Sequence, residues 1–142
     1  MMKRILAFDV GDRRIGVAVS DALGITAQPV ETYHRKGGAE KDAEYLLSLA
    51  RKYVPCTLLF GLPRNMDGTY GEQAEKVKKF VQRVIDQWDG DYAFYDERLT
   101  TMAARRVLLD ADVSREKRKQ VIDKMAAVVI LQGYMESHRN QL

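Results

Sequence analysis

Three carboxylates in this sequence stand where acidic side chains could hold a metal ion. Asp9 lies near the end of an apolar run, Glu97 follows another apolar run, and Asp123 lies on a helical stripe of small and apolar residues. Oxygen ligands without histidine or cysteine companions suit Mg²⁺ or Mn²⁺ rather than zinc. A pair of such ions about 4 Å apart can activate a water and stabilise the leaving oxygen in phosphodiester cleavage. If the three acids meet in one cleft, the sequence predicts that chemistry.

Asp9 and Glu97 also have structural interpretations. An acid at the end of an apolar strand must be exposed at the rim of the sheet or be paired, and ligands of open α/β sheets bind at that rim. Asp9 could instead cap or shape the turn that follows it. Glu97 could pair with Arg98, or it could favour the positive N-terminus of the next helix. The residues alone leave both interpretations open.

Asp123 is the most informative of the three acids. It shares one helical stripe with four residues, which are Ala126, Ala127, Ile130 and Tyr134. An unpaired charge on a core-facing stripe is costly, so Asp123 needs a partner, a metal ion or a water-filled cleft. A salt bridge from Lys119 is the structural alternative, although a lysine N-terminal to the acid is the weaker orientation on a helix. We therefore favour a functional role for Asp123.

These acids depend on an alternation of strands and helices for their positions. The apolar patterns predict strands at residues 3–10, 15–20, 29–34, 56–60 and 92–95. Helices are predicted at 39–53 and 72–88, from Thr100 or Thr101 to Leu109, and from Ser114 to Ser137. We expect one α/β domain over residues 1–142, with a five-stranded mixed sheet flanked by helices. The second strand should run antiparallel to the first, and the last helix should pack near the Asp9 end.

The composition of the 142 residues excludes several classes of protein. With 46% hydrophobic and 30% charged residues the chain is a normal globular one. No apolar run approaches the roughly 18 residues that span a bilayer, and the early charges do not resemble a secretory signal. The single cysteine, Cys56, excludes an internal disulfide framework and a cysteine-rich zinc site. We expect a cytoplasmic protein, either a monomer or a weak homodimer.

Positive charge is concentrated locally, although the formal net charge is only +3. A phosphate backbone responds to local positive potential rather than to net charge. The basic run at 115–119 falls in the first turn of a predicted helix, where positive charge is unfavourable unless an anionic partner binds. A solvated face is the alternative. The residues that we expect to contact nucleic acid are Arg13, Arg14, Arg98, Arg115, Lys117, Arg118 and Lys119.

Four motifs, in order along almost the whole chain, carry a family resemblance. They are DVGDRRIGVAVSD at 9–21, GLPRNMDGT at 61–69, DERLTT at 96–101, and DKMAA at 123–127 followed by ILQ at 130–132. Together they resemble the YqgF (RuvX-type) family of pre-16S rRNA nucleases, which is related to the Holliday-junction resolvases. The resemblance implies an RNase H-like fold and a role in maturing the 5′ end of precursor 16S rRNA during ribosome biogenesis. It also implies Asp9, Glu97 and Asp123 as the catalytic, metal-binding acids.

The chain departs from the related junction resolvases at two acidic positions. Those proteins place an acid at the end of the fourth strand, where this chain has glycine, leucine and proline at 61–63, so the middle acid must come from the fifth strand. Ala126 and Ala127 occupy the turn where a fourth acid would stand beside the helical one. Asp67 could compensate from its loop, but an aspartate before Gly68 is more typical of a turn.

Three functions are compatible with these residues. The first is a metal-dependent endonuclease, with Mg²⁺ or Mn²⁺, acting on structured RNA such as precursor rRNA or on branched DNA. The second is a phosphotransferase, because Asp-x-Gly-x-x-x-x-Gly-x-Ala at 9–18 also resembles the phosphate-binding turn of actin-like sugar kinases. Those enzymes close two lobes over ATP, and this chain has length for only one. The third is a non-catalytic nucleic-acid-binding factor.

Overall fold

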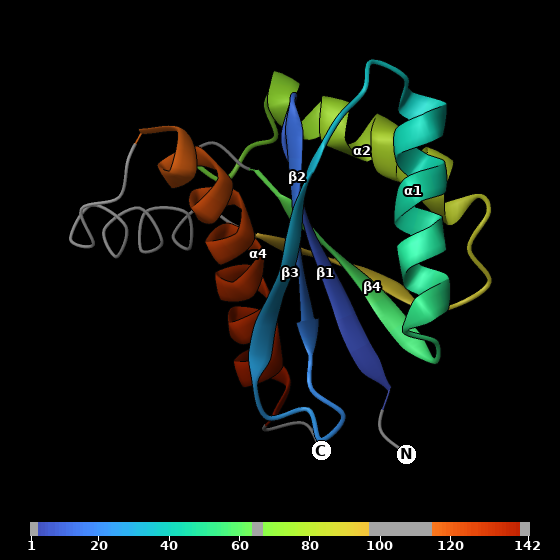
Figure 1. The fold of residues 1–142 in the computed structure, drawn as a ribbon, viewed down its shortest axis with the longest axis vertical. Coiled ribbons are helices and arrows are strands. Elements are labelled where there is room, and N and C mark those ends of the chain that lie inside the picture. Colours follow the sequence, from blue (N-terminus) through green and yellow to red (C-terminus); the bar gives the residue numbers. More distant parts are fainter. Residues whose placement is uncertain (1–2, 64–66, 97–114, 140–142) are drawn as a thin grey trace.

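Five strands and three helices make up the part of the chain that the computed structural model describes (Figure 1). That part is residues 3–63, 67–96 and 115–139, and for 115–124 and 138–139 it is the backbone alone. The elements are β1 (Arg4–Val10), β2 (Arg14–Ser20), β3 (Ala27–His34), α1 (Ala39–Lys52), β4 (Cys56–Leu62), α2 (Glu72–Ile85), β5 (Tyr92–Asp96) and α4 (Arg115–Arg139). No helix within these described ranges is long and apolar enough to cross a membrane.

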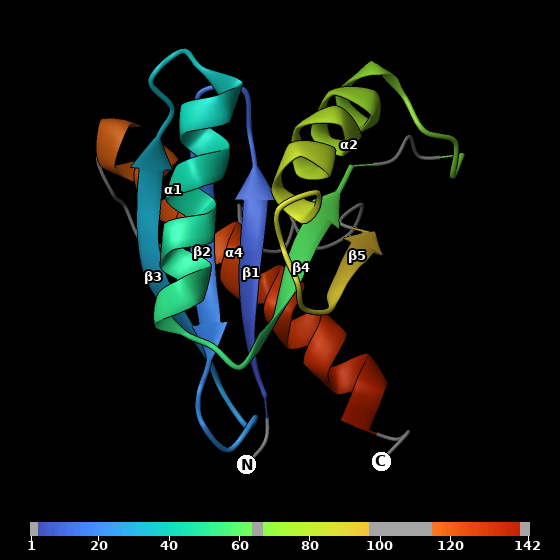
Figure 2. The same cartoon turned by 90° about the vertical axis from the view of Figure 1, so that its right-hand side faces the viewer.

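The strands form one mixed sheet in the order β3-β2-β1-β4-β5. β2 runs antiparallel to both β1 and β3, whereas β1, β4 and β5 are parallel to one another. The predicted mixed sheet and the antiparallel second strand are therefore confirmed. Since β1, β4 and β5 point the same way, their carboxyl ends lie at one edge of the sheet, as Figure 2 shows.

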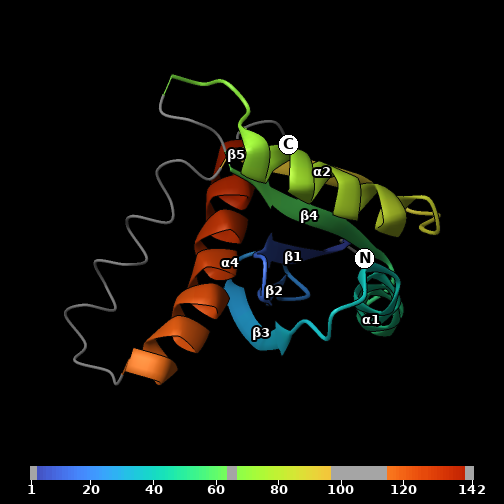
Figure 3. The ribbon, with the colours of Figure 1, turned by 90° about the horizontal axis from the view of Figure 1, so that it is seen from above.

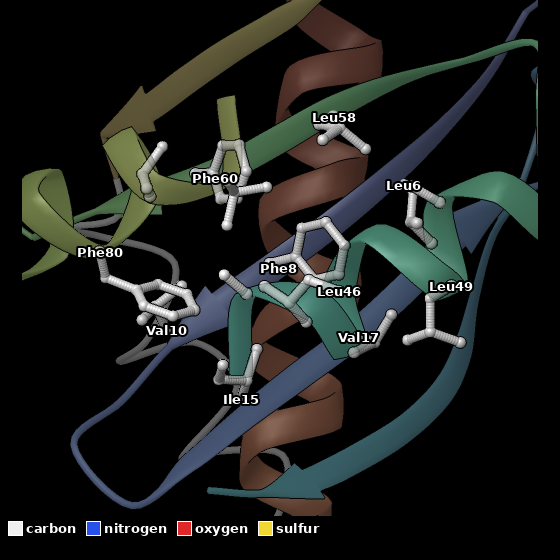
Figure 4. Packing of buried hydrophobic residues seen from close by; sticks show 14 of the residues in the cluster. Leu6, Phe8, Val10, Ile15, Val17, Leu46, Leu49, Leu58, Phe60 and Phe80 are labelled. Atoms are coloured by element: carbon white, nitrogen blue, oxygen red, sulfur yellow. The ribbon is translucent and has the colours of Figure 1, made fainter. Parts of the chain in front are cut away.

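Helices cover both faces of the sheet, with α1 and α2 on one side and α4 on the other (Figures 1 and 3). The larger core cluster lies under α1 and α2 and contains Phe8 and Phe60, whose rings stack with centroids 5.4 Å apart. Figure 4 shows these rings in the same cluster as Leu46 of α1 and Leu58 of β4. Side chains alternate across a strand, so the neighbours of Phe8 in β1 face α4.

The face under α4 is lined by small residues. Ala7 of β1, Ala18 of β2 and Ala127 of α4 are fully buried in the second core cluster. At Gly133 an added Cβ would overlap the hydroxyl group of Tyr95, so any larger residue there requires the Tyr95 side chain to shift. These residues let α4 pack directly on β1, β2 and β3. Its N-terminal part lies at the end of the sheet where β1 terminates, which is the Asp9 end predicted for it (Figure 2).

Most strand and helix boundaries differ from the sequence expectation by one to three residues. β3 begins at Ala27 rather than at Pro29, because the chain pairs with β2 on both sides of a register shift near Pro29. A proline at this position costs no ladder bond on an edge strand. β4 continues past Phe60 to Leu62, and α2 ends at Ile85 rather than at residue 88. The predicted helix at 100–109 lies outside the described residues.

Candidate functional site

Asp9 lies one residue before the end of β1 and is half-buried. Its neighbours Phe8 and Val10 belong to the cluster under α1 and α2, so by strand alternation Asp9 faces α4. Its register partner in β2 is Gly16. On the other side, Gly61 follows Phe60, the β4 partner of Phe8. The two strand positions beside Asp9 therefore carry no side chain, which leaves space next to the carboxylate on the α4 face.

The edge at which Asp9 lies is also the edge at which β5 ends. Leu62 of β4 pairs with Asp96, the last residue of β5, in the parallel ladder. Glu97 is the next residue in the sequence and lies outside the described residues. Parallel pairing of β1, β4 and β5 thus brings the last described residue before Glu97 to the same edge as Asp9.

The third predicted acid, Asp123, belongs to α4, of which the structure describes only the backbone at that position. The stripe on which it was predicted to lie does face the sheet, because Ala126, Ala127 and Ile130 are all buried. Figure 2 shows the N-terminal part of α4 at the end of the sheet where β1 and β4 terminate. The backbone of α4 therefore crosses the face on which Asp9 lies.

The described part of the chain includes only some of the residues predicted to bind metal. Among the side chains that the structure describes, those of residues 3–63, 67–96 and 125–137, no three from His, Cys, Asp or Glu lie close enough to hold a metal ion. The side chains of two of the three predicted ligands, Glu97 and Asp123, do not belong to that description. Asp67, the possible substitute, accepts hydrogen bonds from the Thr69 amide at 2.9 Å and the Thr69 hydroxyl at 2.6 Å. The turn that was favoured for Asp67 is confirmed.

The β1–β2 turn carries Arg13 and Arg14 at the same edge of the sheet. The amide of Gly11 donates to the carbonyl oxygen of Arg14 at 2.9 Å, and a Cβ on Gly11 would lie 2.8 Å from that oxygen. Only glycine fits this close approach. Both arginines line a cleft of about 650 Å³ that opens on the α1 and α2 side of the sheet. Two of the predicted phosphate contacts are thus brought together.

The other predicted phosphate contacts are not placed by their side chains. Arg98 lies outside the described residues. The backbone of the remaining four belongs to the first five residues of α4, as the sequence predicts: Arg115, Lys117, Arg118 and Lys119.

Sequence analysis missed a buried ion pair at this edge. The carboxylate of Asp42, on α1, is 1% exposed and lies 2.9 Å from Nε of Arg35. The Tyr33 hydroxyl donates to it at 2.9 Å and the Lys36 amide at 3.4 Å. Burial alone would raise the pKa of Asp42, but the hydrogen bonds from Arg35, Tyr33 and Lys36 and the Arg35 charge outweigh burial, so the pKa is lowered. The available signal was that Asp42 precedes Leu46 by four residues, on the buried face of its helix.

Comparisons with known proteins agree with this fold. A model of the RuvX family, described as Holliday junction resolvase, matches residues 3–137. A Clostridium novyi (strain NT) protein named "Putative pre-16S rRNA nuclease" is 50% identical over 134 residues, which cover 94% of this chain and 98% of that protein. A protein of the same name from Clostridioides difficile (strain 630) is 53% identical over 133 residues, covering 94% of each chain.

Among solved structures, the chain resembles T. thermophilus RuvC in complex with Holliday junction substrate, with a TM-score of 0.54. The two share 14% sequence identity over 94% of this chain and 96% of that one. At this identity the likeness concerns the fold alone, which is RNase H-like, as the sequence motifs implied. Because the family model and the relatives cover nearly the whole chain, the protein belongs to the RuvX (YqgF) family.

Proposed function

We propose that this protein is a metal-dependent endonuclease that processes the 5′ end of precursor 16S rRNA. The observation that carries the proposal is the position of Asp9, which faces α4 beside Gly16 at the edge where β5 ends. The elements that bear or precede the three acids therefore meet at one edge of the sheet. Relatives that are 50% and 53% identical in sequence carry the name "Putative pre-16S rRNA nuclease", which supports rRNA as the substrate class. Such a substrate belongs to the cytoplasm.

Asp9, Glu97 and Asp123 are the residues proposed to hold Mg²⁺ or Mn²⁺. The donors are all carboxylates, which suits these hard cations, and the glycine beside Asp9 with the alanines of α4 leaves room for ligands on that face. Bound in a pair, such cations neutralise charge on a phosphodiester and promote attack by water. The protein's own part is to hold the three carboxylates together and to orient the strand through Arg13 and Arg14.

Resolution of branched DNA is the second candidate function. It is favoured by the matched family model, which is described as Holliday junction resolvase. RNA and DNA strands present the same phosphodiester to carboxylate-held cations, so the site chemistry does not separate the two. A cleavage assay that compares precursor 16S rRNA with a four-way DNA junction, each with Mg²⁺, Mn²⁺ or a chelator, decides between them. Binding of either substrate without metal-dependent cleavage would identify a non-catalytic factor instead.

Asp123→Asn tests the proposed site. The amide keeps the size of the side chain but removes the charge that a divalent cation needs. We expect loss of Mg²⁺-dependent cleavage with metal-free stability unchanged or increased, because one of three mutually repelling charges is gone. Asp89→Asn, an exposed carboxylate elsewhere on the molecule, is the matched control. A destabilised Asp123→Asn protein that cleaves like the wild type would instead identify Asp123 as a structural partner of Lys119.

A further inference from the structure

The cleft behind the β1–β2 turn is separate from the face on which Asp9 lies. It has a volume of about 650 Å³, within the usual range for ligand sites. Its lining includes Val10 and Phe80, which belong to the core cluster under α1 and α2. Asp9 faces α4 on the other side of the sheet, so the proposed metal site does not account for this cleft. In Figure 2 the N-terminal ends of α1 and α2 lie at the edge where β1 ends.

Positive charge dominates the cleft. Four cationic side chains line it, which are Arg13, Arg14, Arg35 and Lys76. Its two carboxylates offset only part of this charge: Asp42 pairs with Arg35, and Asp12 keeps its charge while it accepts a hydrogen bond from the neutral Gln73 amide at 3.4 Å. Among the residues that the structure describes, neither Arg13 nor Lys76 has an ion-pair partner. The cleft therefore presents uncompensated positive charge to a ligand.

Contacts of Arg35 hold the cationic side of the cleft in position. Arg35 donates through Nε to the buried Asp42 and through Nη1 to the carbonyl oxygen of Gly11, both at 2.9 Å. Its guanidinium carbon lies 4.6 Å from the centre of the Phe80 ring. The Arg35 amide also donates to the carbonyl oxygen of Arg13 at 2.8 Å. These contacts fix the β1–β2 turn against the wall of the cleft, so the turn is already positioned before a ligand binds.

The lining selects phosphate as the ligand chemistry. Arginine forks match phosphate oxygens and a lysine ammonium adds a point charge. The positive ends of α1 and α2, whose N-cap residues Gly38 and Gly71 provide no side-chain cap, reinforce the same preference. We propose that this cleft is a second phosphate-binding site, which holds a single-stranded segment of the nucleic acid whose neighbouring phosphodiester lies at Asp9.

The turn itself connects the two sites. Gly11 is two residues beyond Asp9, which is about 7 Å along an extended chain. A strand that crosses the edge of the sheet over this turn would thus reach from the Asp9 face into the cleft within a few nucleotides. The choice of a nucleic-acid strand rather than a free nucleotide as the ligand rests on the proposed function. The preference of the cleft for phosphate does not depend on that function.

Lys76→Ala, compared with Lys79→Ala, tests the proposal. Both residues are exposed lysines of α2, but only Lys76 lines the cleft. Fluorescence anisotropy would measure binding of a labelled single-stranded RNA in a chelator, so that no cleavage occurs, over a series of salt concentrations. We expect Lys76→Ala to weaken binding about three- to tenfold and to reduce the slope of log K against log salt by about 0.7, which is one phosphate contact. Lys79→Ala should change binding less than about twofold. Equal losses in the two variants would overturn the proposal.

Competition with inorganic phosphate and with ATP distinguishes the sources of phosphate. A strand site predicts weak competition by both, whereas tight ATP binding that is lost in Lys76→Ala, with RNA binding unchanged, would overturn the strand as occupant. The result is also separable from the proposed function. If the protein binds RNA through Lys76 but never cleaves it, the proposed nuclease function is refuted and the proposed phosphate-binding site in the cleft stands. If Lys76→Ala cleaves RNA and binds it with unchanged affinity, the proposed site in the cleft is refuted and the nuclease function stands.

Discussion

Replacement of Asp42 by asparagine should destabilise the protein far more than an ordinary loss of one carboxylate. The amide keeps one acceptor for the Tyr33 hydroxyl, but its NH₂ group then faces the Nε–H of Arg35 with no acceptor between them. Removing one partner of a buried ion pair lowers the free energy of unfolding by about 3–5 kcal/mol. The Arg35 side chain is 19% exposed and regains some water, so we expect a loss near the low end, about 3 kcal/mol.

The expected shift in melting temperature follows from the size of the chain. An unfolding entropy of about 2.1 cal/mol/K per residue gives about 300 cal/mol/K for 142 residues. A loss of about 3 kcal/mol therefore lowers Tm by about 10 °C. Calorimetry and urea unfolding near neutral pH measure both quantities. Asp89→Asn removes the same charge from an exposed position and should stay within about 0.5 kcal/mol of the wild type.

The same pair gives a pH dependence of known sign. The pKa of Asp42 is lower in the folded protein than in the unfolded chain, where a free carboxyl titrates near pH 4. Its ionic contribution is thus fully present above about pH 4 and is lost as the pH falls through the folded pKa. The stability gap between wild type and Asp42→Asn should shrink when urea unfolding is repeated down to about pH 2.5. A gap that stays constant with pH, or that equals the one for Asp89→Asn, would refute the assignment of a charged pair.

Two further predictions concern the two faces of the sheet. Phe8→Ala should cost about 3–5 kcal/mol in urea unfolding, since the ring is fully buried and stacked on Phe60; a loss below about 1.5 kcal/mol would mean that the core collapses around the gap. Gly133→Ala should cost about 1–3 kcal/mol, because the new Cβ meets the Tyr95 hydroxyl. In a Tyr95→Ala background the same change should be neutral or stabilising by up to about 1 kcal/mol, as alanine favours helix over glycine, and an unchanged cost would contradict the contact.

Most of the fold was predictable because the spacing of apolar residues and the residue types in turns determine secondary structure over short stretches of sequence. Residues 3–10 form a near-continuous apolar run, and the structure buries Leu6, Ala7 and Phe8 completely in the central strand β1. The switch from strands in succession to strands that alternate with helices predicted an antiparallel opening followed by parallel strands. Boundaries were less accurate where tertiary pairing decides them. β3 gains Ala27 and Gln28 because β2 offers partners for both.

The site was predictable only as far as position along a strand determines position in space. Asp9 at the end of β1 could be placed at the sheet edge from the sequence. Its orientation toward α4, the fact that Arg13 and Lys76 share a cleft, and the burial of Asp42 all depend on contacts between distant segments. A single sequence gives no pairing for Asp42 with Arg35, since neither type of residue is ordinarily buried.

The small residues under α4 connect the stability of the fold with the geometry of the proposed metal site. The size of the side chains at a contact determines how closely a helix approaches the element on which it packs. Ala7 and Ala18 on the sheet, with Ala126 and Ala127 on the helix, are all buried and leave little side-chain volume between the two. The helix that carries Asp123 therefore lies close to the strand that carries Asp9. Packing that an apolar pattern alone would attribute to the core thus also determines how near the backbones of two proposed ligands come.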